Sequence, residues 1–442
     1  MPIATHPSPD RPVQDDPSAH VSPGEIAIGV IIGRLSEMFD FFVFGIACVL
    51  VFPAVFFPHV DSQTGTFYSF ALFSLAFVAR PFGSLLFRIL HTRYGRGTRL
   101  TIALFALGTG TAGIAFVPGY ATLGTYSIAI LAFMRIVQGL GIAGSWDGLP
   151  SLLALNAPEN RRGWYAMIPQ LGGPIGFLIA AGLFAFLYSS LSLADFLDWG
   201  WRYPFCVAFA INVVALFARL RLVVTPEFTE LLKTRELDPS PLGDLFRTQR
   251  ASIVLGAFAP LASFALFHLV TVFPLSWVTL FSDQSVVDCL IVQMFGAVLC
   301  IVSMLLSGQV ADRIGRRATL AIGAGLIALF SLVGLLPVFL QGTPLGALLF
   351  VLGGFVLLGF CHAQAAGAIN STFPSQYRYS GAIVTSDLAW LFGAAFAPLV
   401  ALFIAANFGV GYVGLYLLSG SVGTLLALGV NRSLEMRSER DQ

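Results

Sequence analysis

Apolar and polar positions alternate along this chain in long blocks, with short polar connections between extended apolar stretches. A helix needs about 20 mainly apolar residues to cross the hydrocarbon core of a bilayer. Twelve stretches satisfy this requirement, at residues 25–57, 66–90, 98–117, 121–149, 162–188, 201–222, 251–281, 286–310, 318–338, 345–372, 379–405 and 409–431. The pattern therefore predicts an all-α integral membrane protein with twelve transmembrane helices.

The twelve predicted helices fall into two groups of six. The segment 223–250 is the only long polar connection, and a short motif recurs on either side of it: TRYGR at 92–96 and DRIGR at 312–316, which are 220 positions apart. Duplicated bundles with a substrate site between them suit alternating access across a membrane. The predicted organisation is a disordered tail at 1–24, a six-helix bundle at 25–222, a linker at 223–250, a second six-helix bundle at 251–431 and a tail at 432–442.

Composition agrees with a membrane protein and excludes a soluble one. The 442 residues are 57% hydrophobic and only 11% charged, and the mean hydropathy is +0.83, well outside the range of soluble domains. The five cysteines stand singly in apolar stretches without metal-ligand spacing, so we expect small buried residues rather than a metal or disulfide site. Residues 1–24 lack the basic start and apolar run of a signal peptide.

The positions of the basic residues predict the orientation of the chain. Lys and Arg are retained on the cytoplasmic side of a membrane, and here they cluster in every second loop, in the linker and in the C-terminal tail. The six alternate loops, near 58–65, 118–120, 189–200, 282–285, 339–344 and 406–408, contain no Lys or Arg. We therefore predict a multi-pass protein of the inner (plasma) membrane with both termini in the cytoplasm.

Eight short strings, in order along nearly the whole chain, carry a family resemblance. They are EMFDFFVFG (37–45), RPFG (80–83), RYGR (93–96), RIVQG (135–139), PQLGGPIG (169–176), WGWRYPF (199–205), DRIGRR (312–317) and RYSG (378–381). With these strings the sequence resembles the major facilitator superfamily, in its metabolite:proton symporter branch, whose members take up proline and betaine, shikimate, 2-oxoglutarate or citrate. The resemblance implies a transporter of a small molecule and protons that sits in a lipid bilayer as a monomer. It implies no nucleic acid partner, no metal and no cofactor other than the proton gradient.

Three positions depart from that family pattern. Thr92 stands where the loop after the second helix usually has an Asp, and Ser145 stands where the AGSWDG string usually has a Glu. Asp147 adds a carboxylate two positions later, which is about 200° around a helix and so cannot take the place of that Glu. Asp387, in the eleventh predicted helix, falls where a neutral or amide residue is expected.

Charged side chains inside a bilayer cost at least ~2.5 kcal/mol each near the helix centre, which makes them functional candidates. Glu37 and Asp40 share one face of the first predicted helix, and Arg135 lies at comparable depth in the fourth. The resemblance implies that these helices line the cavity, so we expect the three side chains to meet. We predict that a carboxylate of the Glu37/Asp40 pair carries the proton, and that Arg135, Glu37, Asp40 and Gln138 bind substrate. The alternative is a structural ion-pair cluster.

The second half contributes further polar candidates. His268, His362 and Gln364 lie in otherwise apolar helices, and histidine titrates near physiological pH. Each histidine can equally be a structural hydrogen-bond donor. Asp387 is a third candidate for proton coupling. Trp390 is included in the predicted substrate site, where aromatic rings can hold a quaternary ammonium group, although most aromatic residues of so Phe-rich a chain face lipid or pack in the core.

The repeated loops are predicted to form a cytoplasmic gate. By resemblance, Gly95 and Gly315 allow tight turns, and arginines bridge neighbouring helix ends when the gate is closed. Because Thr92 cannot pair as Asp would, we expect a weaker gate in the first half, or one re-formed by Asp147. The alternative is that these arginines only fix the topology. The predicted gate residues are Arg93, Gly95, Arg96, Asp147, Asp312, Arg313, Gly315 and Arg316.

These observations predict proton-coupled import of a small organic acid held by Arg135, or of a betaine-like zwitterion held by both charge signs. A proton-driven exporter and an uncoupled uniporter are alternatives within transport. A transporter-like membrane receptor is an alternative of another class, favoured by the departures at Thr92 and Ser145. An enzyme is excluded by the lack of a nucleophile with a base, a phosphate loop or a metal cluster in the sequence.

Overall fold

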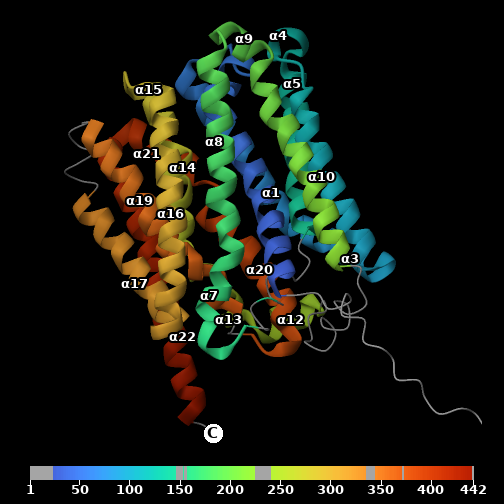
Figure 1. The fold of residues 1–442 in the computed structure, drawn as a ribbon, viewed down its shortest axis with the longest axis vertical. Helices are drawn as coiled ribbons and strands as arrows, with labels where there is room; N and C mark the ends of the chain where they lie inside the picture. Colours follow the sequence, from blue (N-terminus) through green and yellow to red (C-terminus); the bar gives the residue numbers. More distant parts are fainter. Residues whose placement is uncertain are drawn as a thin grey trace, which may run out of the picture.

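The computed structural model describes residues 23–145, 153, 157–223, 240–334, 344–370 and 373–440, and this part of the chain is almost entirely helical (Figure 1). The α-helices are α1 (Pro23–Leu50), α2 (Phe52–Val55), α3 (Ser62–Ala115), α4 (Tyr120–Leu123), α5 (Thr125–Gly144), α7 (Arg162–Met167), α8 (Gly172–Ser190), α9 (Leu193–Asp198), α10 (Tyr203–Val223), α12 (Leu242–Thr248), α13 (Arg250–Phe258), α14 (Leu261–Thr271), α15 (Phe273–Phe281), α16 (Val286–Ile314), α17 (Arg316–Leu329), α19 (Pro344–Asn370), α20 (Ser375–Gly393), α21 (Ala397–Phe408) and α22 (Val413–Arg440). Short 3-10 segments lie at Glu159–Arg161, Ile168–Leu171, Gly200–Arg202 and Val410–Tyr412, and a π-helical turn at Phe330–Gly334.

Each of the twelve predicted segments overlaps helix. Within the described residues, nine continuous helical stretches are long and apolar enough to cross a membrane. One of them, α3, has 54 residues and contains a sharp bend at Gly95 (φ 81°), so it corresponds to two predicted helices, 66–90 and 98–117. The all-helical membrane architecture predicted from the hydropathy pattern is therefore confirmed, and the twelve segments are consistent with it.

The internal repeat is visible in the backbone. Gly95 and Gly315, which are 220 positions apart, both have positive φ (81° and 91°), a conformation that costs glycine little. Gly139 and Gly359, also 220 apart, both lie at close helix crossings: an added Cβ would come within 2.2 Å of the Ala76 carbonyl oxygen and 2.4 Å of the Cys300 carbonyl oxygen. Small residues let membrane helices approach closely. The two halves therefore use the same turn and the same kind of close contact.

Proline breaks divide one of the predicted helices at two places. The segment predicted as one helix at 251–281 is three helices, α13, α14 and α15, interrupted at Pro260 and before Pro274, because proline lacks the N–H that a helix interior requires. The Gln293 amide of α16 donates to the carbonyl oxygens of Val270 and Thr271, at 2.8 Å each. These bonds satisfy carbonyl groups that the break would otherwise leave without partners.

Helices of the two halves pack against each other along several lines. In Figure 1, α1, α3, α5, α8 and α10 lie to one side, and α14, α16, α17, α19 and α21 lie to the other. Helices α7 and α8 pack on α16, α3 packs on α20, and α1 packs on α15. The main apolar core includes buried residues of both halves and runs continuously between them. The interface between halves is thus filled by side chains at its centre.

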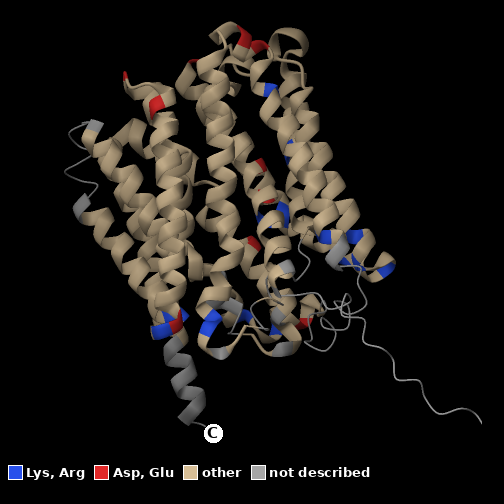
Figure 2. Ribbon diagram, viewed as in Figure 1, with Lys and Arg blue, Asp and Glu red and all other residues tan. Residues whose placement is uncertain are grey.

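The two ends of the molecule differ in charge (Figure 2). We call one of them the basic end: it contains the Gly95 bend of α3, the start of α7, helix α12 and the turn between α16 and α17. At the opposite end, Asp61 caps α3, and its carboxylate accepts hydrogen bonds from the side chain (2.7 Å) and backbone (3.0 Å) of Thr64, which lower the pKa of Asp61. Arg202 also lies there and donates to the carbonyl oxygens of Ala115 (2.5 Å) and Val117 (3.1 Å) at the end of α3.

Candidate functional site

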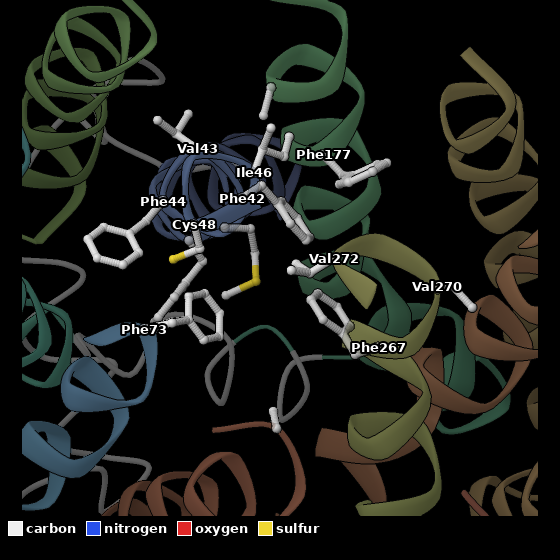
Figure 3. Close-up of a cluster of buried hydrophobic side chains, with 14 of the residues drawn as sticks. Phe42, Val43, Phe44, Ile46, Cys48, Phe73, Phe177, Phe267, Val270 and Val272 are labelled. Carbon is white, nitrogen blue, oxygen red and sulfur yellow. The ribbon is translucent and has the colours of Figure 1, made fainter. Parts of the chain in front are cut away.

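Aromatic rings from both halves meet at the centre of the molecule. Phe42 of α1 stacks on Phe267 of α14 at 5.5 Å between ring centroids, and Figure 3 shows these rings among neighbouring apolar side chains. Phe41 of α1 and Phe77 of α3 stack on Trp390 of α20, at 6.3 Å and 5.9 Å. Each of these rings is buried. The helices that carry them belong to different halves, so a relative movement of the halves must separate these ring pairs.

Trp390 is flanked by two guanidinium groups. The Cζ atoms of Arg34 and Arg80 lie 5.5 Å and 5.9 Å from the centre of the indole ring, within the distance for cation–π attraction. The ring is 1% exposed, and its Nε1 donor has no hydrogen-bond partner in the described part of the chain. Each of these two arginines is also paired with a carboxylate, Arg34 with Glu37 and Arg80 with Asp387.

Arg80 forms an ion pair that links the halves. Its Nε lies 3.1 Å from Oδ1 of Asp387 in α20, and Ser84 donates to the other carboxylate oxygen at 2.5 Å. Both charged side chains are nearly fully buried, at 6% and 5% exposed. One donor of the guanidinium, Nη1, has no partner among the described residues. Asp387, one of the predicted coupling residues, therefore contacts an arginine that the sequence interpretation had not considered.

Glu37 lies in a second charged cluster near the end of α5. Its carboxylate is 3.2 Å from Arg34 and 3.6 Å from Arg219 of α10, and it accepts a hydrogen bond from Ser145 Oγ at 2.7 Å. Arg219 also donates to the Ser145 backbone carbonyl. A single carboxylate here faces two arginines, so its negative charge is fully compensated.

Asp40 lies in a neutral polar environment one turn further along α1. Its Oδ2 accepts hydrogen bonds from Thr111 (3.0 Å) and from Asn212 (2.9 Å), whereas Oδ1 has no partner within the described residues. Gln138 donates to Thr111 at 2.7 Å and accepts from Arg135 at 3.1 Å. A continuous row of hydrogen-bonded side chains therefore connects Asp40 to Arg135.

The structure corrects the expectation that Glu37, Asp40 and Arg135 meet. Arg135 donates to the Phe73 carbonyl oxygen at 3.3 Å and lies over the Phe44 ring at 4.0 Å. Within the described residues it forms a hydrogen bond or ion pair with neither carboxylate. The physical reason is distance along α5: Ser145, which binds Glu37, is ten residues from Arg135, or ~15 Å of helix. Only Asp40 is near enough to be connected with Arg135, through two intervening side chains.

Arg135 is one of several arginines buried or half-buried among the helices. Arg80 and Arg219 are buried, and the Arg34 side chain is only 18% exposed. Arg80 was visible in the sequence as part of the RPFG string inside a predicted helix, and Arg34 lies nine residues inside the first. Counting arginines inside the predicted helices would have found both, although it would not have identified their partners.

The remaining candidates of the second half lie in different places. His268 packs edge-on against Phe73 at 5.1 Å, and neither ring nitrogen has a partner in the described structure. His362 lies 3.3 Å from Ser263 Oγ, through Nδ1. Gln364 instead donates to the Gly163 carbonyl oxygen at 3.2 Å, at the start of α7. The two histidines thus lie near the central rings, whereas Gln364 contacts the basic end.

Of the predicted gate residues, Asp312 makes the clearest contact between halves. Its Oδ1 accepts hydrogen bonds from the backbone N–H groups of Gly163 (2.7 Å) and Trp164 (3.1 Å), at the start of α7. In the other loop, Thr92 donates only to Ile89 of its own helix, at 2.9 Å. The other predicted gate residues flank the two bends, namely Arg93, Gly95, Arg96, Arg313, Gly315 and Arg316. Asp147 lies outside the described residues.

Comparison with known proteins gives a consistent result. The sequence pattern of the Major Facilitator Superfamily matches residues 41–386. The inner membrane metabolite transport protein YhjE of Escherichia coli K12 is 36% identical over 411 residues, which cover 92% of this chain and 93% of that protein. The shikimate transporter of the same organism is 27% identical over 406 residues, covering 89% and 91%.

Solved structures share the arrangement of helices. A D-xylose–proton symporter superposes with a TM-score of 0.70 over 92% of this chain and 97% of that chain, at 18% sequence identity. The same kind of symporter with a bound bromodeoxyglucose gives a TM-score of 0.73 over 92% and 94%, also at 18% identity. At this identity the likeness concerns the fold alone.

Proposed function

Because this chain belongs to the major facilitator superfamily, among metabolite carriers that include the shikimate and proline/betaine transporters, we propose that it imports a small organic acid together with protons. The chain is a metabolite transporter of the membrane and not an enzyme. Alternating access between the two halves would move the acid across the inner membrane. By the rule that basic residues stay inside, the basic end and both termini would face the cytoplasm.

The observation that carries this proposal is the buried Arg80–Asp387 pair beside Trp390. A buried ion pair is costly to break, because removing one charge leaves the other uncompensated. A substrate carboxylate can take the place of Asp387 on Arg80 if Asp387 accepts a proton at the same time. Substrate and proton then enter together, and the neutralised Asp387 no longer holds α20 to α3. This exchange would couple binding to movement of the halves.

The surroundings of Trp390 favour an organic acid over a betaine. Arg34 and Arg80 both lie within 6 Å of the ring, so a trimethylammonium group there would meet two like charges. The unsatisfied donors Trp390 Nε1 and Arg80 Nη1 suit an acceptor such as a carboxylate or hydroxyl oxygen. A zwitterion would need a carboxylate close by for its cation, and Glu37 and Asp387 are both already paired with arginines.

We assign different roles to the two carboxylates of α1. Glu37 is paired with Arg34 and Arg219, so we propose that it holds α1 to α10. Asp40 has only neutral hydrogen-bond partners and one oxygen without a partner in the part described, so it is the carboxylate of this pair that can take up a proton. Arg135 would then act on Asp40 through Gln138 and Thr111. Substrate contact by Arg135 itself fits less well, because Phe44 and the Phe73 carbonyl cover its guanidinium.

Uptake into proteoliposomes tests the proposal. Purified protein would be reconstituted and offered radiolabelled shikimate, 2-oxoglutarate, proline and glycine betaine, with and without an acidic exterior. We expect uptake of an acid, driven by the pH gradient and lost in Arg80→Gln. The matched control is Arg202→Gln, which removes an arginine from the opposite end and should transport normally. Preference for betaine, or normal transport by Arg80→Gln, would refute the proposed site.

The same assay separates the alternative functions. Counterflow of a substrate without any response to the pH gradient would identify a uniporter. If the substrate moved out of the proteoliposomes when protons flowed in, the protein would be an exporter. Saturable binding to the purified protein without movement into liposomes would identify a receptor.

A further inference from the structure

A cavity of about 160 Å³ lies at the basic end, away from the central rings. It is enclosed by α3 of the first half, α20 of the second half and the short linker helix α12. Its walls include Ile383 and Val384 of α20 and Phe246 of α12. An engineered apolar cavity of comparable volume in another protein, about 150 Å³, binds benzene. The space is therefore sufficient for a ligand with one small ring or a branched chain.

The wall of this cavity contains two arginines and one carboxylate. Arg88 and Arg99 of α3 line it, and Arg99 is 4% exposed and donates to the Tyr379 hydroxyl at 2.9 Å. The carboxylate in the lining, Asp387, is already bound by Arg80 and Ser84. Asp387 lies eight residues from Tyr379 along α20, or ~12 Å of helix. The end of the cavity near Tyr379 therefore contains the Arg99 guanidinium, and apolar residues of α20 and α12 line the middle.

Helix α12 of the linker forms one wall of this cavity and is held there by specific contacts. Helix α12 is part of the segment predicted as a polar connection, yet its Leu245 is fully buried in a small apolar core that also includes Ile253 and Phe373. The Ser240 backbone N–H donates to Ser380 Oγ of α20 at 2.9 Å. The linker is thus held against the helix that forms one wall of the cavity. A ligand in the cavity would touch both halves and the segment that joins them.

We propose that this cavity is a second ligand site, for a small amphipathic monocarboxylate of about the size of benzoate. The carboxylate binds Arg88 and Arg99, and the apolar body lies along Ile383, Val384 and Phe246. The cavity adjoins the transport site proposed above, because Ser84 and Asp387 lie in its wall. The second ligand is nevertheless held by Arg88 and Arg99, and its binding does not require the import proposed above. Because the ligand contacts α3, α20 and α12 together, it binds better to the closed basic end and so favours that state.

Binding of 4-fluorobenzoate to full-length protein in lipid nanodiscs, followed by fluorine NMR, tests the site directly. We expect saturable binding, with 4-fluorobenzamide about tenfold weaker or more because it lacks the charge. Arg88→Gln and Arg99→Gln should each weaken benzoate binding about tenfold. Arg247→Gln, an exposed arginine on the same linker helix that does not line the cavity, is the matched control and should bind as the wild type does.

Two further arms keep the result unambiguous. Val384→Phe and Ile383→Phe fill the cavity without changing charge and should abolish binding, with folding checked by thermal unfolding. Bound benzoate should also slow hydrogen exchange in α12 and α20 of the wild type, but not of Arg88→Gln. The proposal would be overturned if the benzamide bound as tightly as the benzoate, or if benzoate still bound to both filling variants. It would also be overturned if benzoate binding were lost in Arg80→Gln and kept in Arg88→Gln. The last outcome would place the benzoate at the central site. Transport is not measured in this experiment, so its failure is distinct from failure of the proposed import.

Discussion

The two repeated turns at the basic end have the same backbone and different chemistry. Gly95 and Gly315 both adopt positive φ, but the residue at the start of each motif differs. Asp312 binds two backbone N–H groups of α7, across the interface between halves, whereas Thr92 binds only the Ile89 carbonyl of its own helix. A carboxylate at a helix N-terminus is favoured by the helix dipole and the free N–H groups there. One side chain therefore decides whether the turn joins the halves.

The side without this contact is held by other groups. Helix α20 is joined to α3 by the Arg80–Asp387 pair and by the hydrogen bond from Arg99 to Tyr379. Its second turn also binds the linker, because Ser380 accepts a hydrogen bond from the Ser240 N–H. On the α16–α7 side the polar contacts, from Asp312 and Gln364 to Gly163 and Trp164, lie at the basic end. On the α3–α20 side the polar contacts extend from the basic end to the central rings. The two duplicated sides of the molecule are therefore held together by different contacts between the halves.

The largest effect is expected from breaking the buried pair on the α3–α20 side. Asp387→Asn leaves Arg80 without its counter-charge and should destabilise the protein by about 3–5 kcal/mol. The double variant Arg80→Gln with Asp387→Asn should recover much of that free energy of unfolding but still fail to transport. Thermal unfolding in detergent and uptake assays measure the two quantities. Equal stability of the single variants and the wild type would show that this pair does not hold the halves.

A smaller effect is expected from Asp312→Asn on the other side. This change weakens hydrogen bonds to a charged acceptor, which contribute about 1.5–3 kcal/mol, and it should shift the halves toward opening at the basic end. Spin-label distances between α7 and α16 would report the shift, with Asp61→Asn at the opposite end as the control. If Asp312→Asn transports normally and its distances are unchanged, the loops serve only to fix topology.

The linker contact is expected to contribute less again. Ser380→Ala removes the acceptor for the Ser240 N–H, and a neutral hydrogen bond contributes about 1 kcal/mol. We expect faster hydrogen exchange in α12 with transport retained. Ser386→Ala, on the same helix but outside this contact, is the comparison variant. Unchanged exchange in α12 would mean that Leu245 alone holds the linker in place.

The smallest effect is expected from restoring the missing carboxylate. Thr92→Asp should allow a contact with the start of α20 that resembles the one made by Asp312, worth about 0.3–1 kcal/mol at an exposed helix end. Uptake should slow by no more than a few-fold because the closed state becomes more stable. Thr92→Asn carries no charge and should behave as the wild type does. Faster uptake in Thr92→Asp would contradict the proposed asymmetry.

Much of the fold could be predicted, because the position of each helix follows from its own hydropathy and the position of each bend follows from its own glycine. The helical segments and the paired bends at Gly95 and Gly315 follow from the order of residues along the chain. The helix breaks at Pro260 and Pro274 also had a local signal, which the long apolar span at 251–281 concealed. The linker helix α12 had a weaker signal, because Leu245 is the only buried residue of this short helix.

The candidate site was harder to predict because it depends on how helices are rotated against each other. Spacing along α1 placed Glu37 and Asp40 on one face, but it could not determine which neighbours they meet. In the structure Glu37 pairs with Arg219 and Asp40 accepts a hydrogen bond from Asn212. Arg80 and Asp387 are 307 positions apart, and no local pattern connects them. The depth of a charged side chain in the membrane can be predicted from the sequence, whereas its partner on another helix can be identified only from the tertiary structure.

Helix α16 has a mechanical consequence for such a carrier. It holds the broken segment of α14 through Gln293 at one point and the start of α7 through Asp312 at another. These residues are 19 positions apart, or ~28 Å along one uninterrupted helix. A rod clamped at both places transmits tilt from one to the other. A tilt of α16 at the α14 break would therefore displace the contact between Asp312 and α7 as well.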